Sequence, residues 1–267
     1  MMDLVSVIIP TFDRKEALLR AVRSCLEQSH AVHEVLVCDD GSTDGSREAI
    51  LALDIAQVKW IGGERAGRPA VPRNRGINAA TGHWLAFLDS DDAWVPEKLA
   101  AQLKLMERSR CRASCSNAER IMPDQRSSGP YFTEKADRFG LRDLLYVNRV
   151  ICSSAVVERE VMLETGGFPE APEMRAIEDH AAWLRVTAHT ELCYSPEPLV
   201  RYTDDAKNSI RKEDVPVSAQ RERVLNDLLS WGGSTAFSMA QRSAIARALK
   251  HAREGTTPSR MERLFRW

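Results

Sequence analysis

The first hundred residues alternate between short apolar runs and segments whose apolar side chains follow helical spacing. Residues 5–10 (VSVIIP), 34–38 (EVLVC) and 84–88 (WLAFL) are nearly continuous apolar runs, which is typical of central strands covered on both faces. Around them we expect a further strand over residues 58–61 and helices over residues 14–28, 45–53, 73–80 and 96–108. Strands that alternate with helices predict an α/β fold with a mainly parallel sheet and crossover helices.

The second half of the chain has a less regular pattern. We expect a strand over residues 113–117, a polar loop over 123–129, an apolar run over 150–157, a helix over 177–188 and an extended segment over 192–202. From residue 216 onward the spacing indicates two or three helices that could pack as a separate cap.

Composition and charge narrow the class of protein. The chain has 267 residues, of which 43% are hydrophobic and 28% are charged, as in ordinary soluble globular proteins. Its net charge of −1 gives no overall field suited to nucleic acid, so we expect no nucleic-acid partner. The sequence contains no run of eighteen apolar residues, so we expect no membrane-spanning helix.

The N-terminus and the cysteines bear on location. Residues 1–4 (MMDL) lead directly into the first apolar run without the pattern of a secretory signal. Six cysteines are present, none in a C-x-x-C pair, and several lie in apolar stretches, so we expect reduced, buried thiols rather than a disulfide framework. These features predict a cytoplasmic protein.

Polar residues follow three of the predicted strands at their carboxyl ends. They are Thr11-Phe12-Asp13 after the first strand, Asp39-Asp40 after the second and Asp89-Ser90-Asp91-Asp92 after residues 84–88. Ligands in open α/β sheets bind outside the carboxyl ends of the strands, so we expect these three groups to converge.

The densest of these groups is the segment from Asp89 to Asp92. Its three carboxylates repel one another unless a cation neutralises them. Mg²⁺ and Mn²⁺ prefer oxygen ligands, and Mg²⁺ typically binds one or two carboxylates together with substrate phosphates. The segment therefore suits a metal that bridges protein and diphosphate, although an acidic loop that caps the next helix would look the same.

Other candidates have similar alternatives. Asp40 could accept hydrogen bonds from a nucleobase or ribose or, with Asp39, cap the helix after Asp44. Phe12 could stack on a base or belong to the core. Arg73 could clamp a phosphate or extend into solvent.

Taken together, the motifs resemble those of the family 2 glycosyltransferases, which have the GT-A fold. The resemblance covers about residues 4 to 203. The matching segments within it are VSVIIPTFDR (5–14), EVLVCDDGSTDGS (34–46), RNRGINAATG (73–82), WLAFLDSDD (84–92), GGF (166–168) and EDHAAWLR (178–185). The resemblance implies inverting transfer from a nucleoside-diphosphate sugar, commonly a UDP-sugar, to a hydroxyl acceptor, as in cell-surface polysaccharide or glycolipid synthesis.

The resemblance also implies roles for individual residues. It places Asp91 and Asp89, with Asp92 as a further candidate, on Mn²⁺ or Mg²⁺. It assigns the catalytic base to Asp179 and the acceptor side to Glu178, His180 and Trp183. The residues that it places around the donor nucleotide are Pro10, Thr11, Phe12, Asp13, Asp40, Arg73, Asp89 and Ser90.

Domain boundaries follow from the same comparison. Residues 1–212 would form the catalytic domain, with a nucleotide-binding half (1–118) and an acceptor-binding half (119–212), and residues 213–267 a helical, basic extension. Three positions depart from the family: His180 stands where an aromatic residue is frequent, Ala181 where an acidic residue is frequent, and Thr203 where a basic residue is frequent.

A base at Asp179 would remove the proton of the attacking hydroxyl, while the metal offsets charge on the departing diphosphate. Alternatively, Glu178 and Asp179 have no catalytic role and lie in the first turn of a helix only because the helix dipole stabilises negative charge there.

The sequence argues against three other classes of protein. A nucleotidyltransferase usually has a glycine-rich basic loop after the first strand, where this chain has residues 10–14 (PTFDR). A dinucleotide-dependent oxidoreductase would carry G-x-G-x-x-G after a strand, which is absent from the sequence. A non-catalytic nucleotide-binding module would not need Asp89–Asp92 together with Glu178-Asp179.

The C-terminal segment from Arg242 to Arg266 is basic, with an apolar stripe at Ile245, Ala248 and Leu249, and the chain ends in LFRW. Such a segment could lie on an anionic membrane surface, as suits a saccharide or lipid-linked saccharide acceptor and a position on the inner face of the membrane. It could equally be a helix packed on the catalytic domain.

Overall fold

A computed structural model describes residues 3–133, 135–205, 215–233 and 236–257 of the chain. The helices and strands predicted for residues 5–108 are confirmed, with small shifts at their ends. In order they are β1 (Val5–Thr11), α1 (Lys15–Leu26), β2 (Glu34–Asp39), α2 (Ser46–Leu51), β3 (Val58–Ile61), α3 (Ala70–Ala79), β4 (Trp84–Phe87) and α4 (Lys98–Ser109), with a short β5 (Ala93–Trp94) that was not expected.

The second half contains more elements than the sequence pattern indicated. The apolar run at residues 150–157 forms a 3₁₀ turn, η1, followed by a strand rather than one continuous element. The elements are β6 (Ala113–Ile121), β7 (Ser127–Pro130), β8 (Arg138–Phe139), α5 (Leu141–Leu144), η1 (Cys152–Ser154), β9 (Val156–Glu158), α6 (Arg159–Glu164), η2 (Pro172–Met174), α7 (Glu178–His189), β10 (Leu192–Thr203), α8 (Val217–Gly232) and α9 (Met239–Arg253).

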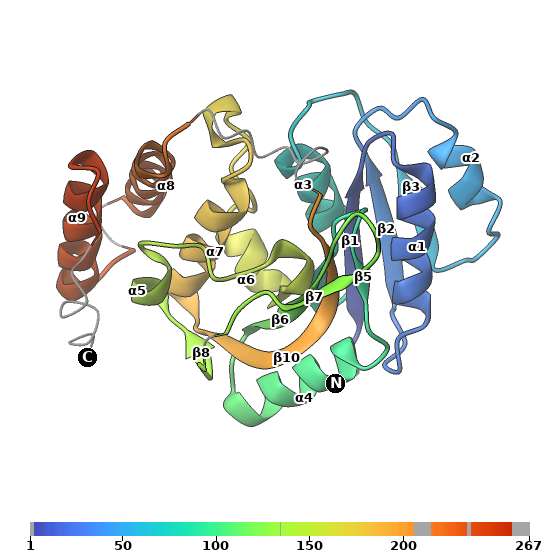
Figure 1. Cartoon of the computed structure of the whole chain (residues 1–267), viewed down its shortest axis with the longest axis horizontal. Helices are drawn as coiled ribbons and strands as arrows, with labels where there is room; N and C mark the ends of the chain where they lie inside the picture. The colour runs from blue at the N-terminus through green and yellow to red at the C-terminus, as the bar shows by residue number, and fades with distance from the viewer. Residues whose placement is uncertain (1–2, 134, 206–214, 234–235, 258–267) are drawn as a thin grey trace.

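Within the described residues these strands form one mixed sheet with helices on both faces (Figure 1). Its order is β3-β2-β1-β4-β9-β6-β10-β5, with β7 beside β6 and β8 beside β10. The first four strands are parallel, and β6 is parallel to β10. The short β9 runs antiparallel to both β4 and β6 and joins the two parallel groups.

Strand β1 lies within the sheet and is covered on both faces, which accounts for its continuous apolar run. Val5, Val7 and Ile9 pack in one cluster with α1 and α4, while Ile8 packs in a second cluster with α3 and α7. Successive side chains of a strand point to opposite faces, so both faces of β1 are buried. Gly76 lets α3 approach closely, because a Cβ there would lie 2.7 Å from Cys38 Sγ and from Ile8 Cγ2.

The C-terminal helices share the core that packs against the sheet. Val224, Leu225 and Leu228 of α8 belong to the same buried cluster as Phe87 of β4, and Arg185 of α7 forms an ion pair with Asp227 of α8 at 2.8 Å. The expectation of a separate cap is therefore wrong for the described part of this region. The expected division at residues 118/119 falls inside β6, which belongs to the same sheet as β1.

Helix α9 buries its apolar stripe in the core, so the stripe is not available to a membrane surface. Ile245, Ala248 and Leu249 lie in the core cluster, while Arg247 and Lys250 are exposed. The closing residues 258–267, with their aromatic side chains, lie outside the described residues. Among the residues described, no helix has the length and apolar character needed to cross a bilayer.

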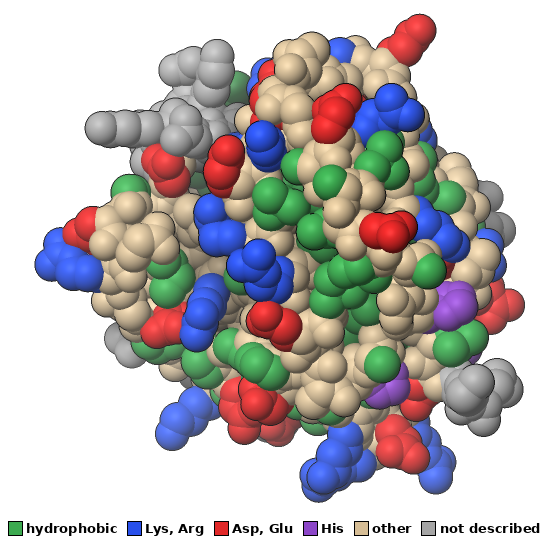
Figure 2. Space-filling view, turned by 90° about the vertical axis from the view of Figure 1, so that its right-hand side faces the viewer, with side chains coloured by type: hydrophobic (Ala, Val, Ile, Leu, Met, Phe, Trp, Pro, Cys, Tyr) green, Lys and Arg blue, Asp and Glu red, His purple; other side chains and the backbone are tan. Residues whose placement is uncertain are grey.

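All six cysteines lie in the described part of the chain, and each is a buried free thiol, as expected. Figure 2 shows acidic and basic side chains interspersed over the face seen from the α2 side, in keeping with the net charge of −1.

Candidate active site

The three polar segments predicted to converge do so at the carboxyl edge of the sheet. Thr11 pairs with Asp39 across β1 and β2, and the backbone N–H of Asp40 donates to the Thr11 carbonyl at 2.9 Å. Strand β4 pairs with the other side of β1, and the N–H of Leu88 donates to the Ile8 carbonyl at 3.1 Å. Because β1, β2 and β4 are parallel and in register, the three polar segments lie side by side at the carboxyl edge of the sheet.

The acidic segment after β4 separates into carboxylates with different surroundings. The side chains of Asp89 and Asp91 are 31% and 35% exposed, and each contacts an arginine: Asp91 pairs with Arg14, and Asp89 with Arg73 at 2.6 Å. Burial raises the pKa of Asp91, with Arg14 opposing the shift and Asp89 adding to it. Two partly exposed carboxylates, each paired with an arginine, therefore lie at this edge of the sheet.

Asp92 does not belong to this exposed pair. It is buried, and its carboxylate accepts hydrogen bonds from Ser153 Oγ at 2.5 Å and from the backbone N–H of Thr203 at 2.8 Å. Burial, together with Asp91 and Asp89, raises its pKa. Its oxygens fasten the β4 end to η1 and β10, so Asp92 is less accessible to a metal than Asp89 and Asp91. Ser90 is also buried.

Two residues that the sequence predicts to bind the nucleoside, Phe12 and Asp40, contact the loop between β3 and α3. The Asp40 carboxylate accepts hydrogen bonds from the N–H groups of Ala66 and Gly67, both at 2.8 Å. The guanidinium of Arg65 lies 3.2 Å from the centre of the Phe12 ring. The segment of residues 62–69, the covering loop, therefore contacts both side chains. Arg65 was not among the residues expected from the sequence.

The remaining donor-side candidates are held by the surrounding backbone. Pro10 and Thr11 are buried within β1. Asp13 has a positive φ of 45°, and its Oδ1 accepts a hydrogen bond from the Thr43 N–H at 2.7 Å. Asp39 accepts hydrogen bonds from the N–H groups of Gly41 and Ser42, so it shapes the turn that follows β2.

Arg73 connects the acidic segment to the first turn of α7. Its side chain is only 5% exposed; Nη2 donates to Asp89 Oδ1 at 2.6 Å and Nη1 donates to Glu178 Oε1 at 2.9 Å. This guanidinium binds two carboxylates instead of extending into solvent. Arg73 and Glu178 are 105 positions apart in the sequence, and their contact places Asp89 and Glu178 in one site.

The acidic pair at the start of α7 is largely buried. Burial raises the pKa of Glu178, although Arg73 opposes the shift. Asp179 Oδ2 accepts a hydrogen bond from Asn148 Nδ2 at 3.0 Å, and Oδ1 accepts one from the His180 backbone N–H at 2.8 Å. Asn148 was not among the residues expected from the sequence.

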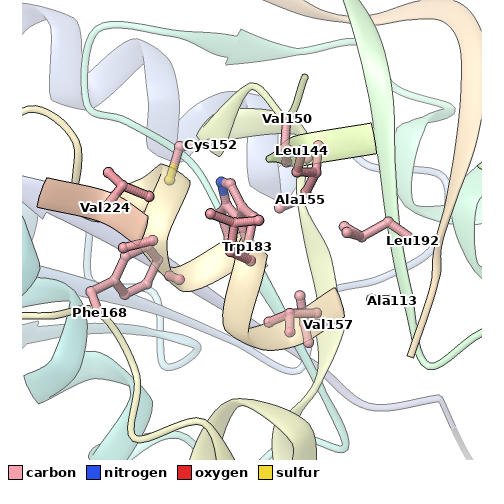
Figure 3. Packing of buried hydrophobic residues seen from close by; sticks show 14 of the residues in the cluster. Ala113, Leu144, Val150, Cys152, Ala155, Val157, Phe168, Trp183, Leu192 and Val224 are labelled. Carbon is pink, nitrogen blue, oxygen red and sulfur yellow. The ribbon is translucent and has the colours of Figure 1, made fainter. Parts of the chain in front are cut away.

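The other two acceptor-side candidates face the interior. His180 Nε2 lies 2.7 Å from the Leu144 carbonyl oxygen, and burial lowers the pKa of His180. Trp183 is 0% exposed and packs edge-on against Phe87 and Phe168, as Figure 3 shows for its neighbours in the cluster. The expectation that Trp183 contacts an acceptor is therefore corrected: one turn beyond Asp179, the helix has entered the core.

The GGF segment forms a tight turn against α3. Asn74 Nδ2 donates to the Phe168 carbonyl at 2.8 Å, and Asn74 Oδ1 accepts from the Phe168 N–H at 2.9 Å. Gly167 has a φ of +72°, and a Cβ there would lie 2.5 Å from Asn74 Oδ1. A cavity of about 250 Å³ lies beside this turn, lined by residues that include Asn78, Leu163 and Glu170.

The residues present fit a divalent cation that also binds a diphosphate. Within the described residues no group of three or more His, Cys, Asp or Glu side chains could enclose a metal. Asp91 and Asp89 nonetheless offer two neighbouring, partly exposed carboxylates, which is the protein share that Mg²⁺ usually takes beside substrate phosphates.

Comparisons with known proteins relate the chain to one protein family. A model of glycosyl transferase family 2 matches residues 6–163. The chain is 30% identical over 183 residues to the Escherichia coli UDP-Glc:alpha-D-GlcNAc-diphosphoundecaprenol beta-1,3-glucosyltransferase WfgD, covering 68% of this chain and 69% of that protein. It is 31% identical over 185 residues to the E. coli enzyme of the same description, WfaP, covering 69% and 70%.

Solved structures share the fold. Residues 1–349 of S. aureus TarS, in complex with UDP-GlcNAc, match with a TM-score of 0.77 and 17% identity, covering 99% of this chain and 76% of that one. The likeness confirms the expected GT-A arrangement, a mixed and mainly parallel sheet flanked by helices with a helical C-terminal part.

Proposed function

Because the chain belongs to glycosyl transferase family 2, we propose that it transfers a hexose, with inversion, from a UDP-sugar to a hydroxyl of a lipid-linked saccharide. The relatives WfgD and WfaP are described as acting with UDP-Glc on a diphosphoundecaprenol-linked sugar, so UDP-glucose is the first donor to test. The observation that carries the proposal is the double contact of Arg73 with Asp89 and Glu178.

That contact supports the following order of groups along the site. Phe12 and Asp40 would hold the nucleoside once the covering loop withdraws from them. Asp91 and Asp89 would hold Mn²⁺ or Mg²⁺ at the diphosphate; when bound, such a cation offsets the charge that builds on the departing nucleoside diphosphate. Arg73 keeps Asp89 and Glu178 around one guanidinium, so the donor side abuts the first turn of α7.

Asp179 would then act as the general base. Its carboxylate would accept the proton of the acceptor hydroxyl as that oxygen attacks the anomeric carbon and the bond to the diphosphate breaks. Direct attack from the face opposite the leaving group inverts the anomeric centre. The first-turn position of Asp179 in α7 also places it near backbone N–H groups that favour a negative charge.

The test is a screen of nucleotide sugars with the purified chain, with and without Mn²⁺, that measures donor affinity and release of nucleoside diphosphate. We expect UDP-glucose to stand out and Asp91→Ala to reduce its Mn²⁺-dependent turnover by about 10²-fold or more. Asp124→Ala, at an exposed turn, is the matched control and should leave turnover unchanged. Equal donor binding with and without Mn²⁺ would show that Asp91 has been assigned wrongly.

Peripheral contact with the inner face of the membrane is a further part of this proposal. The exposed basic side chains of α9, including Arg247 and Lys250, would interact with anionic headgroups. Sedimentation with phosphatidylglycerol vesicles tests this: wild type should co-sediment at low salt, and the Arg247→Glu, Lys250→Glu double variant should remain in solution. Equal sedimentation of the two would remove α9 as the contact.

A further inference from the structure

Asn148 contacts the side chain to which we assign the base. It lies between α5 and η1, and its Nδ2 donates a hydrogen bond to Asp179 Oδ2 at 3.0 Å. We infer that Asn148 is a positioning residue, which fixes the orientation of the Asp179 carboxylate toward the acceptor hydroxyl. The inference rests on the proposed role of Asp179 as general base.

The orientation of the Asn148 amide is determined by its second hydrogen bond. Its Oδ1 accepts from the backbone N–H of Val150 at 3.0 Å. Exchange of the amide oxygen and nitrogen would set N–H against N–H at Val150 and oxygen against oxygen at Asp179. Because only one of the two orientations satisfies both partners, the amide N–H must point at the carboxylate.

The Asp179 carboxylate is then held through both of its oxygens. Oδ1 accepts the backbone N–H of His180 at 2.8 Å, and Oδ2 accepts the Asn148 amide. Rotation of the carboxylate about its bond to Cβ would break both hydrogen bonds. An ionised carboxylate can accept about four hydrogen bonds in total, so one or more lone pairs remain for the proton of the acceptor. A base fixed in this way meets the geometric demand of an in-line reaction.

The segment that carries Asn148 is itself fastened to α7. His180 Nε2 lies 2.7 Å from the Leu144 carbonyl oxygen; since a carbonyl only accepts, Nε2 must carry the hydrogen. Two neighbouring residues of α7, Asp179 and His180, therefore contact two points of the segment between Leu144 and Asn148. This double attachment limits movement of Asn148 relative to the base.

The test uses three substitutions. Asn148→Asp retains an oxygen that can accept from the Val150 N–H but loses the donor to Asp179. Asn148→Ala loses both contacts, and Asn226→Ala, at an exposed position of α8, is the matched control. Each variant is assayed for kcat, for the KM of the donor, for Tm and for the dependence of kcat on pH.

We expect Asn148→Ala to lower kcat about 10- to 100-fold, with donor KM within about 2-fold of wild type. In Asn148→Asp a second carboxylate faces Asp179, so the acidic limb of the kcat profile should move upward by about one pH unit or more. Asn226→Ala should match wild type. A residue with only a structural role would lower Tm or raise KM and leave the acidic limb in place, which would overturn the inference.

Asp179→Asn separates this inference from the proposed function. If Asp179→Asn is inactive while both Asn148 variants keep the wild-type kcat and pH profile, Asn148 is not a positioning residue and the base assignment stands. If Asp179→Asn transfers sugar at the wild-type rate, Asp179 is not the base and the inference fails with it.

Discussion

The donor side and the acceptor side of the site differ in how their charged groups are held. On the donor side, Asp91 pairs with Arg14, whose side chain is 30% exposed, and Asp40 is bound by backbone N–H groups of the covering loop. On the acceptor side, Glu178 and Arg73 form a buried ion pair whose side chains are 4% and 5% exposed, and Asp179 is held through both oxygens.

This difference separates groups that a ligand can recruit from groups that are already in place. A divalent cation can replace Arg14 at Asp91, and a nucleobase can replace Arg65 at Phe12, because both contacts lie at the surface and are individually weak. The Arg73–Glu178 pair is buried away from solvent, so loss of either side chain would leave the other as an unpaired buried charge. We therefore expect the Arg14 and Arg65 contacts to give way when the donor binds, whereas the Arg73 contacts with Asp89 and Glu178 stay in place.

The largest effect is expected from Asp179→Asn. The amide keeps the shape of the side chain but cannot take a proton, so kcat should fall about 10²- to 10⁴-fold, while the affinity for donor stays unchanged. Isothermal titration with UDP and a radiolabelled transfer assay measure the two quantities. Loss of donor affinity in the same variant would contradict the distinction between the donor side and the acceptor side, because Asp179 would then also contribute to donor binding.

The two arginines provide a matched pair for stability. Arg73→Met should lower the free energy of unfolding by about 3–5 kcal/mol, because it leaves Glu178 buried without a partner. Arg14→Met removes a partly exposed ion pair and should change it by less than about 1 kcal/mol. Urea denaturation followed by circular dichroism measures both values. Similar losses in the two variants would contradict the contrast between a fixed and a replaceable contact.

Arg65→Ala tests whether the covering loop competes with the nucleoside. Loss of its stacking on Phe12 should free the ring and tighten UDP binding about 3- to 10-fold, given the usual strength of a cation–π contact. Arg47→Ala, at an exposed position of α2, is the control and should bind UDP as wild type does. Weaker UDP binding in Arg65→Ala would mean that Arg65 closes over the base instead of standing in for it.

The smallest effect concerns pH and His180. Burial lowers the pKa of His180 from its ordinary 6.5, so as pH falls below that value the unfolded chain takes up a proton that the folded chain does not. Stability should therefore decrease as pH drops through 6.5, by about 1.4 kcal/mol for each unit of pKa shift. His180→Gln keeps a neutral donor for Leu144 and should flatten this part of the curve, whereas His33→Gln, at an exposed position, should not. An unchanged slope in His180→Gln would show that another group titrates.

Much of the fold and the placement of the acidic segments could be predicted from local pattern. Continuous apolar runs identified β1, β2 and β4, and the rule that parallel strands end at one edge brought Asp13, Asp40 and Asp89 together. The run at residues 150–157 was recognised as apolar, but its antiparallel pairing as β9 depends on partners in β4 and β6 that are distant along the chain.

The side-chain contacts of the site required the structure. Asp91 and Asp92 are adjacent, yet Asp91 pairs with Arg14 and Asp92 is buried against Ser153, a difference that no local pattern shows. Helix α7 is buried on all sides over residues 178–187, so periodicity alone could not show that Trp183 faces the core. Asn148 follows no local pattern, since its partner lies 31 positions later.

The most direct test of the account is a crystal structure of Asp179→Asn with UDP-glucose and Mn²⁺. We predict the uracil on Phe12 with the covering loop displaced, the diphosphate and the cation at Asp91 and Asp89, and residue 179 facing the anomeric carbon within the same site. A nucleotide bound away from the carboxyl edge of the sheet, or one that leaves Asp91 and residue 179 on opposite sides of the protein with no shared site, would contradict it.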